Sequence, residues 1–282
     1  MKRPHMTRPA WCLLVLVSIA GCTPTARTAG PKIYVLTDLE GASGVYQFSQ
    51  TREKGSPGNL LACEYLMGDL AAVVCGFRDA GAGEILILDG HGNQAFVPHL
   101  AEPGAKYITG TPRPEVLYGL DDSYAGIAMI GMHAMMGTSD GVLHHTESSR
   151  GENRYWYHGV ESGELAQGAI MAAHYGVPPI MVSGDEATCR EATRFFGPEC
   201  VTVATKRGIN REAAVLYPFD ETRQALYEGA RRAVRAISRC RPYRVEFPIQ
   251  ARKQWLVREG DKPPRLETKE GTIADPLRLL DF

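Results

Sequence analysis

The stretch Lys32-Ile-Tyr-Val-Leu-Thr-Asp-Leu-Glu-Gly-Ala-Ser-Gly44 joins an apolar run to two carboxylates and several small residues. A short apolar run that ends in polar residues is typical of a buried strand. Asp38 and Glu40 follow this run, and the glycines after them allow the backbone to turn close to a ligand. Carboxylates at i and i+2 face the same way on an extended backbone. At a strand end they form either a cation site or, as the simpler alternative, a helix cap or a solvated turn.

Outward from this stretch, apolar runs alternate with segments of helical periodicity. We expect further strands at Glu84–Asp89, Gly126–Gly131, Pro179–Ser183 and Val201–Thr205, and helices over Leu60–Ala80, 161–175, Asp185–Phe196 and Asp220–Arg239. Strands that alternate with helices predict an α/β fold with a mainly parallel sheet flanked by helices. Residues 31–240 are predicted to form this domain, and residues 241–282 a smaller, extended C-terminal region of the same domain.

The first thirty residues resemble an export signal rather than part of the fold. Lys2, Arg3 and Arg8 precede an apolar run, Trp11–Ala20, that is too short to span a bilayer. The run ends in Ile19-Ala-Gly-Cys22, which resembles a bacterial lipobox. We therefore expect residues 1–21 to be a lipoprotein signal peptide, Cys22 to be lipidated, and residues 22–30 to be a tether. An acylated cysteine would hold the domain at a membrane of the bacterial cell envelope, facing the periplasm or the exterior.

The composition excludes several other classes of protein. The 282 residues carry 31 Lys and Arg against 32 Asp and Glu, a net charge of −1, with no basic excess of the kind that nucleic-acid binders show. Hydrophobic residues are 44%, as in ordinary globular domains. Seven cysteines are too few for a disulfide scaffold, although a Cys189–Cys200 pair is conceivable in an oxidising compartment.

Polar motifs follow several of the predicted strands and one helix start. They are Asp89-Gly-His91, Gly131-Met-His133, Gly141-Val-Leu-His-His145 and Gly163-Glu164. Ligands of open α/β sheets bind beyond the carboxyl ends of the strands, so these side chains are expected at one rim. Adjacent histidines on an extended chain face opposite ways, so at most one of His144 and His145 faces that rim. Asp89 is a candidate either for a metal ligand or for orienting the His91 ring.

This donor set favours a dinuclear metallohydrolase. Mixed imidazole and carboxylate ligands suit zinc, manganese or iron. The set has more ligands than one tetrahedral zinc uses, which points to two metal ions that share a carboxylate. A nucleotide-binding alternative is disfavoured, because the first strand is followed by carboxylates and not by a Gly-x-Gly-x-x-Gly phosphate loop.

Taken in order from Lys32 to Ala214, these motifs, with Met181-Val-Ser-Gly-Asp185, resemble the zinc-dependent D-aminopeptidases of peptidase family M55. The resemblance implies two zinc ions per subunit, with Asp38 as the bridging carboxylate and His145 as the catalytic residue, described as a nucleophile. The implied zinc ligands are Asp38, Glu40, His91, His133 and Glu164. Asn93 and Thr146 are secondary candidates for substrate contacts, and Asp185 is either such a contact or a helix cap.

The resemblance implies release of N-terminal D-amino acids from short peptides, by a ring-shaped homo-oligomer such as a decamer. Two other functions use the same residue types. One is a dinuclear amidase or phosphatase, which a substrate panel would separate from a peptidase. The other is a surface lipoprotein that binds peptides or metal without catalysis, which would bind metal stoichiometrically and show no turnover.

Overall fold

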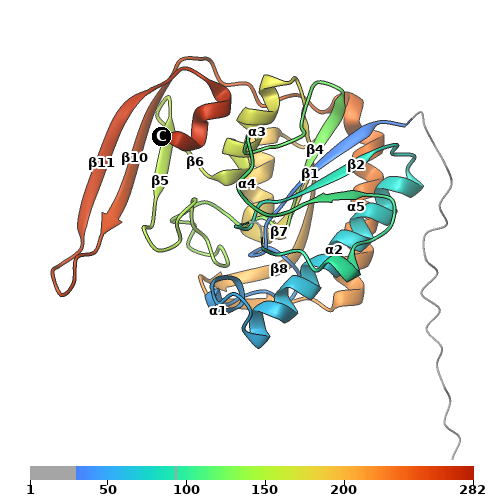
Figure 1. Ribbon diagram of the computed structural model, residues 1–282, viewed down its shortest axis with the longest axis horizontal. Helices are drawn as coiled ribbons and strands as arrows, with labels where there is room; N and C mark the ends of the chain where they lie inside the picture. Colours follow the sequence, from blue (N-terminus) through green and yellow to red (C-terminus); the bar gives the residue numbers. More distant parts are fainter. Residues whose placement is uncertain (1–29, 93) are drawn as a thin grey trace, which may run out of the picture.

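A computed structural model describes residues 30–92 and 94–282. The predicted signal peptide, the lipidation site Cys22 and the candidate Asn93 lie outside the described residues. The main sheet has the strand order β3-β2-β1-β4-β7-β8-β9 (Figure 1). Its strands are β1 (Lys32–Thr37), β2 (Ile85–Asp89), β3 (Lys106–Ile108), β4 (Tyr124–Ile130), β7 (Pro179–Asp185), β8 (Val201–Asn210) and β9 (Ala213–Leu216). All neighbours run parallel except β8 and β9, which confirms the predicted mainly parallel sheet.

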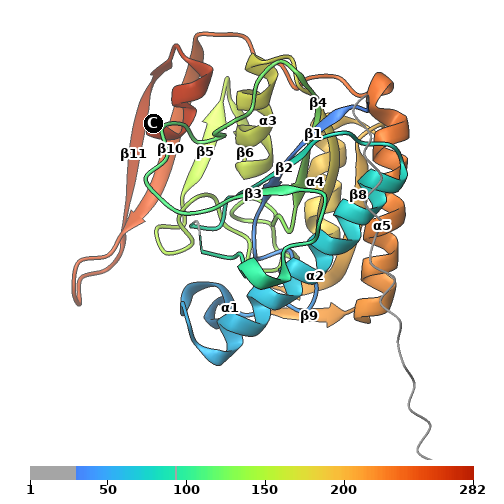
Figure 2. The same cartoon turned by 45° about the vertical axis from the view of Figure 1, so that its right-hand side comes forward.

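Helices cover both faces of this sheet (Figure 2). On one face α2 (Pro57–Asp79) packs against α5 (Phe219–Ala236), and their apolar side chains share a core with Ile33 and Val35 of β1. On the other face α3 (Glu164–His174) and α4 (Glu186–Phe196) enclose a second core around Tyr34. The remaining helical segments are α1 (Phe48–Arg52) and the 3-10 turns η1 (Pro98–Leu100), η2 (Ile237–Arg239) and η3 (Pro276–Asp281).

The long helix α2 shows how local sequence sets the element boundaries. Ser56 caps its first turn by accepting a hydrogen bond from the Asn59 N–H, and Pro57 stands at the first helical position. The helix ends before Gly81, which adopts φ +95°, as the sequence predicts. By length and composition α2 could cross a membrane, but 56% of that window is buried within the protein, so it is a core helix.

A second, antiparallel sheet stands beside the main one, in the order β11-β10-β5-β6. It joins β5 (Arg154–Tyr157) and β6 (Val160–Ser162) to the C-terminal hairpin of β10 (Ile249–Val257) and β11 (Arg265–Ile273). The helix predicted over 161–175 is wrong at its start, because Val160–Ser162 pairs as a strand and α3 begins at Glu164. The conceivable Cys189–Cys200 disulfide is absent, since all five cysteines of the described chain are free thiols.

Strand register brings the predicted polar motifs to one rim. Thr37, the last residue of β1, pairs with Asp89 on one side and with Ile130 on the other. The residues that follow these three positions therefore leave the sheet side by side, at the carboxyl ends of β1, β2 and β4. They include Asp38, His91 and His133, whose side chains the sequence places just beyond the strand ends.

The loops after β1 and β4 cross in direct backbone contact. The Asp38 N–H donates to the Ile130 carbonyl (2.9 Å), and the Gly41 N–H donates to the Gly131 carbonyl (2.7 Å). A Cβ on Gly41 would overlap the Met132 carbonyl oxygen, and one on Gly131 would overlap the Asp38 carbonyl oxygen. Glycine at both positions lets the two polar loops approach closely enough to share a site.

The crossing predicts a large cost for Gly131→Ala. Gly131 and Gly176 both adopt φ +75°, but nothing lies within 4 Å of a Cβ at Gly176. Gly176→Ala should cost only about 1–2 kcal/mol of strain, and Gly131→Ala about 1–3 kcal/mol more because of the overlap. Urea denaturation of both variants measures the difference, and equal losses would show that the crossing is not a tight contact.

Candidate active site

Asp38 lies between two groups of ligand atoms. Its Oδ1 is 2.9 Å from Nδ1 of His91, which is also 3.0 Å from Oε2 of Glu40. Its Oδ2 is 3.2 Å from Nε2 of His133, which is also 3.4 Å from Oε1 of Glu164. The two oxygens of one carboxylate thus face two separate donor sets. This is the arrangement expected of a carboxylate that bridges two metal ions.

The three histidines are held by backbone carbonyls on the side of the ring away from the ligand atoms. His91 Nε2 donates to the Thr51 carbonyl (2.9 Å), His133 Nδ1 to that of Ala134 (3.0 Å), and His145 Nδ1 to that of Leu143 (2.7 Å). These contacts direct the opposite nitrogen of each ring toward the carboxylates. Ligand imidazoles in metal sites are oriented in the same way.

Two buried atoms of this cluster contact only the other ligand groups, as ion pairs, and make no well-formed hydrogen bond within the described chain. They are Oε2 of Glu40, a residue only 3% exposed, and Nε2 of His133, which is 2% exposed. An unpaired buried polar atom is costly unless something else satisfies it. Among the described residues, two groups that share His133 bring ligand atoms within 4.8 Å of one another, namely Asp38–Glu40–His133 and His133–His145–Glu164. The residues therefore fit a pair of divalent cations, and their chemistry suits zinc.

The charges of the cluster shift its titration strongly. Burial raises the pKa of Asp38, but hydrogen bonding and charge from His133 and His91 outweigh burial and hold the pKa far below its usual range. Burial also raises the pKa of Glu164, but the charge of His133 outweighs burial and lowers this pKa to about 2. Burial lowers the pKa values of His91 and His133, yet the carboxylates around them raise both well above the ordinary 6.5. Without a cation, the two imidazoles thus carry the positive charge that balances the carboxylates.

His145 differs from the other two imidazoles. Burial, and then the charge of His133, lower its pKa, so the ring is neutral near pH 7. The ring stacks on His133 with 3.9 Å between centroids, and its Nε2 lies 3.9 Å from Oε1 of Glu164. A neutral ring whose Nδ1 already donates to Leu143 presents a lone pair at Nε2. This nitrogen can accept a proton or attack an electrophile beside the metal ligands.

The neighbouring His144 is not part of the cluster, in agreement with the expectation that at most one of the two histidines faces the rim. Its Nδ1 accepts a hydrogen bond from the Gly137 N–H (3.2 Å), and burial lowers its pKa to about 4. The loop that carries both histidines is strained at Leu143, which adopts φ +52°. It is tied down where the Val142 N–H donates to Oδ2 of Asp185.

Three further sequence candidates lie outside the cluster. The suggestion that Asp89 binds metal or orients His91 is wrong, because its Oδ2 accepts from Ala95 N and Thr109 Oγ1 and so shapes the loop after β2. Thr146 is buried and its Oγ1 accepts from the Met136 N–H, which stabilises the histidine loop. Asp185 caps α4 by accepting from the Thr188 N–H.

Sequence reasoning missed Lys206, which holds the ligand loop in place. This lysine on β8 is fully buried, and its Nζ donates to the carbonyls of Glu40 (2.7 Å) and Ala42 (2.8 Å). Burial lowers its pKa to about 8, although nearby carboxylates oppose that shift. Only the tertiary structure brings it to the loop, since it lies more than 160 positions away in the chain.

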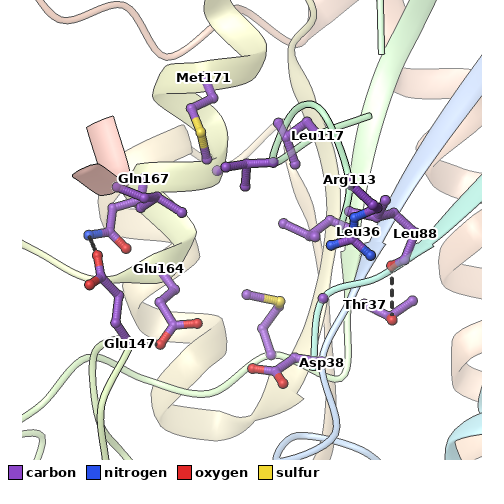
Figure 3. Close-up of a pocket in the computed structure, with 15 residues that line it drawn as sticks. Leu36, Thr37, Asp38, Leu88, Arg113, Leu117, Glu147, Glu164, Gln167 and Met171 are labelled. Atoms are coloured by element: carbon purple, nitrogen blue, oxygen red, sulfur yellow. Dashed lines mark hydrogen bonds between the residues drawn. The ribbon is translucent and has the colours of Figure 1, made fainter. Parts of the chain in front are cut away.

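A cleft of about 120 Å³ opens beside the cluster, on the α3 side of the sheet. Asp38 and Glu164 reach its floor, with Glu147 and Gln167 on one wall and Arg113 on the other (Figure 3). Its apolar lining includes Leu36, Leu88, Leu117, Met132 and Met171. Substrate clefts commonly combine apolar walls with a few convergent polar groups in this way.

The protonated state of His91 and His133 predicts proton release when metal binds. Zinc needs neutral imidazoles, so loading the metal-free protein at pH 7 should release about two protons per subunit. Calorimetric titration with Zn²⁺ in buffers of different ionisation enthalpy measures the number. His144→Gln should release the same number, and zinc binding without proton release would contradict the assignment of these two ligands.

Comparison with known proteins shows which family the chain resembles. The model of the family Peptidase_M55, described as D-aminopeptidase, matches residues 32–258. A D-aminopeptidase of Bacillus subtilis (strain 168) is 28% identical over 265 residues, covering 89% of this chain and 92% of the relative. A solved structure of the Zn-dependent D-aminopeptidase DppA from Bacillus subtilis, described as a self-compartmentalizing protease, has the same fold. Its TM-score is 0.79 at 22% identity, covering 89% of this chain and 94% of that one. The family match spans most of the chain, and the protein therefore belongs to the D-aminopeptidase family.

Proposed function

We propose that this protein is a zinc-dependent aminopeptidase that releases N-terminal D-amino acids from short peptides. The observation that carries the proposal is the placement of Asp38, whose two oxygens face two donor sets beside the neutral, buried His145. Family membership supports the hydrolase chemistry, and the zinc dependence of the B. subtilis neighbour supports the metal.

The residues divide the work as follows. Asp38, Glu40, His91, His133 and Glu164 would hold two zinc ions, which supply Lewis acidity toward a peptide amine, a scissile carbonyl and a water molecule. The apolar walls of the cleft exclude bulk water from the peptide and hold it against the floor. As a general base, His145 Nε2 takes a proton from the attacking water and then donates that proton to the leaving amine. As a nucleophile, Nε2 instead attacks the carbonyl, the leaving amine takes its proton from water, and a second water molecule hydrolyses the acyl-imidazole.

A substrate panel with metal removal tests the proposal. The purified protein, loaded with zinc, should hydrolyse D-alanyl dipeptides faster than the L-dipeptides and should leave a phosphomonoester intact. Chelation should abolish activity and added Zn²⁺ should restore it. Full activity after chelation would sink the metallopeptidase function, and turnover of the phosphomonoester alone would favour the phosphatase alternative.

The two adjacent histidines offer a matched pair of variants. His145→Gln should lower kcat by about 10²–10⁴-fold, because it removes the lone pair that carries the proton, while zinc content is retained. His144→Gln keeps a hydrogen-bond acceptor for Gly137 and should stay within a few-fold of wild type. Equal activity in the two variants would remove His145 from the mechanism.

We also propose that the enzyme is a lipid-anchored protein of the bacterial cell envelope. The support is the sequence Ile19-Ala-Gly-Cys22 after a basic start and a short apolar run. Peptides that contain D-amino acids and derive from the cell wall are then the natural substrate class. Cys22→Ala should move the protein from the membrane fraction to the soluble fraction, and an unchanged distribution would refute the anchor.

Assembly into a homo-oligomer, with a decamer as the expected form, is a further part of the proposal. It is supported by the description of the B. subtilis neighbour as self-compartmentalizing. The mass of the purified protein in solution tests it, and a monomer at micromolar concentration would contradict it.

A further inference from the structure

Arg113 is the one cationic side chain that lines the cleft beside the metal ligands, as far as the structure describes the chain. The other charged groups there are the carboxylates of Asp38, Glu147 and Glu164. In Figure 3 Arg113 lies on the wall opposite Glu147 and Gln167, with Asp38 between them at the base. A lone guanidinium in a cleft that otherwise carries carboxylates is a feature that the hydrolytic machinery does not use.

The anchoring of Arg113 leaves three of its five N–H donors free. Nη1 donates to the carbonyls of Asp89 (3.2 Å) and Gly110 (3.4 Å). The described chain offers no hydrogen bond to Nε or Nη2, and it places no carboxylate in an ion pair with this guanidinium. Two backbone carbonyls thus orient the planar group without neutralising it. A guanidinium held this way is prepared to bind a carboxylate through two parallel N–H donors.

Glu147, on the opposite wall, is already engaged. One of its oxygens accepts from the Tyr155 hydroxyl and the other from Nε2 of Gln167 (2.9 Å). Its backbone N–H donates to Oε1 of Glu164 (2.6 Å). Glu147 is therefore held by the protein, while the charge of Arg113 remains available to a ligand.

The position of Arg113 relative to Asp38 sets the length of such a ligand. Arg113 is hydrogen-bonded to the carbonyl of Asp89, and Asp89 pairs with Thr37, the residue before Asp38. Adjacent strands are about 4.8 Å apart, and the contact of Nη1 with the Asp89 carbonyl adds 3.2 Å, so the guanidinium lies on the order of 10 Å from Asp38. A hydrogen bond from the guanidinium to a carboxylate takes up about 3 Å of this span. An extended peptide advances about 3.3 Å per residue, so the rest fits one or two residues beyond a scissile bond held at the metal ligands.

We propose that Arg113 binds the free α-carboxylate of the short peptide substrate, so that the enzyme prefers peptides with an unblocked C-terminus. This inference rests on the proposed aminopeptidase function and names the substrate class of that same site. Arg113 would select substrates by binding their carboxylate, away from the bond that is cleaved. Arg113 is accordingly a specificity residue and takes no part in proton transfer.

The test compares D-alanyl-D-alanine with its C-terminal amide, on the zinc-loaded full-length protein. Wild type should prefer the acid over the amide by about 10–100-fold in kcat/KM, as expected for a charge-assisted bidentate contact. Arg113→Gln should lose this preference through a higher KM for the acid, with kcat nearly unchanged and the amide unaffected. Arg113→Lys should retain part of the preference, because the charge remains but the fork is lost.

Arg231→Gln is the matched control. Arg231 is a partly exposed arginine on α5, across the sheet from the cleft, where it pairs with Glu228. It should behave as wild type toward both substrates. Binding can also be measured without turnover, in variants that carry His145→Gln in addition. In that background, calorimetry should show binding of the acid weakened 10–100-fold by Arg113→Gln and binding of the amide unchanged.

The outcomes separate the two proposals. If wild type hydrolyses neither peptide, the aminopeptidase function fails and the role of Arg113 fails with it. If wild type hydrolyses acid and amide equally well, or Arg113→Gln slows both to the same extent, the function stands and the carboxylate contact is refuted. Thermal unfolding of Arg113→Gln and Arg113→Lys shows whether the variants fold, and a folded Arg113→Gln with the full acid preference would also overturn the inference.

Discussion

The contact of Asp38 with His91 on one oxygen and His133 on the other is the interaction on which the site depends. It gathers Asp38, Glu40 and Glu164 in a volume from which water is largely excluded, where carboxylates without counter-charge would be very costly. Protonated imidazoles supply that counter-charge in the metal-free protein, and two cations would replace them. The repulsion among these buried carboxylates therefore favours the binding of metal cations.

The rest of the fold holds this contact in place. Parallel strands bring the residues after β1, β2 and β4 to one rim, and glycines at 41 and 131 let two loops cross without side chains between them. Lys206 donates hydrogen bonds to the carbonyls of Glu40 and Ala42 and so holds the loop that carries the ligands. Backbone carbonyls orient all three imidazoles, so the ligand geometry is set before any cation arrives.

The predictable part of this structure came from local patterns. Apolar runs followed by Asp38, His91 and His133 gave both the strands and the rim, because the carboxyl ends of parallel strands share an edge. The charged strands β5, β6, β10 and β11 carry weak alternation and were not predicted, and α3 started later than expected. Asp89 resembled a metal-site residue in sequence, yet backbone and hydroxyl donors of its own loop engage it. Lys206 and Arg113 act through contacts between distant segments, which no local pattern reveals.

The most direct test of the account is anomalous diffraction at the zinc edge from crystals of the zinc-loaded protein. The account predicts two peaks about 3.5–4 Å apart, one on either side of the Asp38 carboxylate. One should lie against Glu40 and His91, and the other against His133 and Glu164. A single peak, or peaks that do not contact Asp38, would contradict the claim that this carboxylate bridges two metal ions.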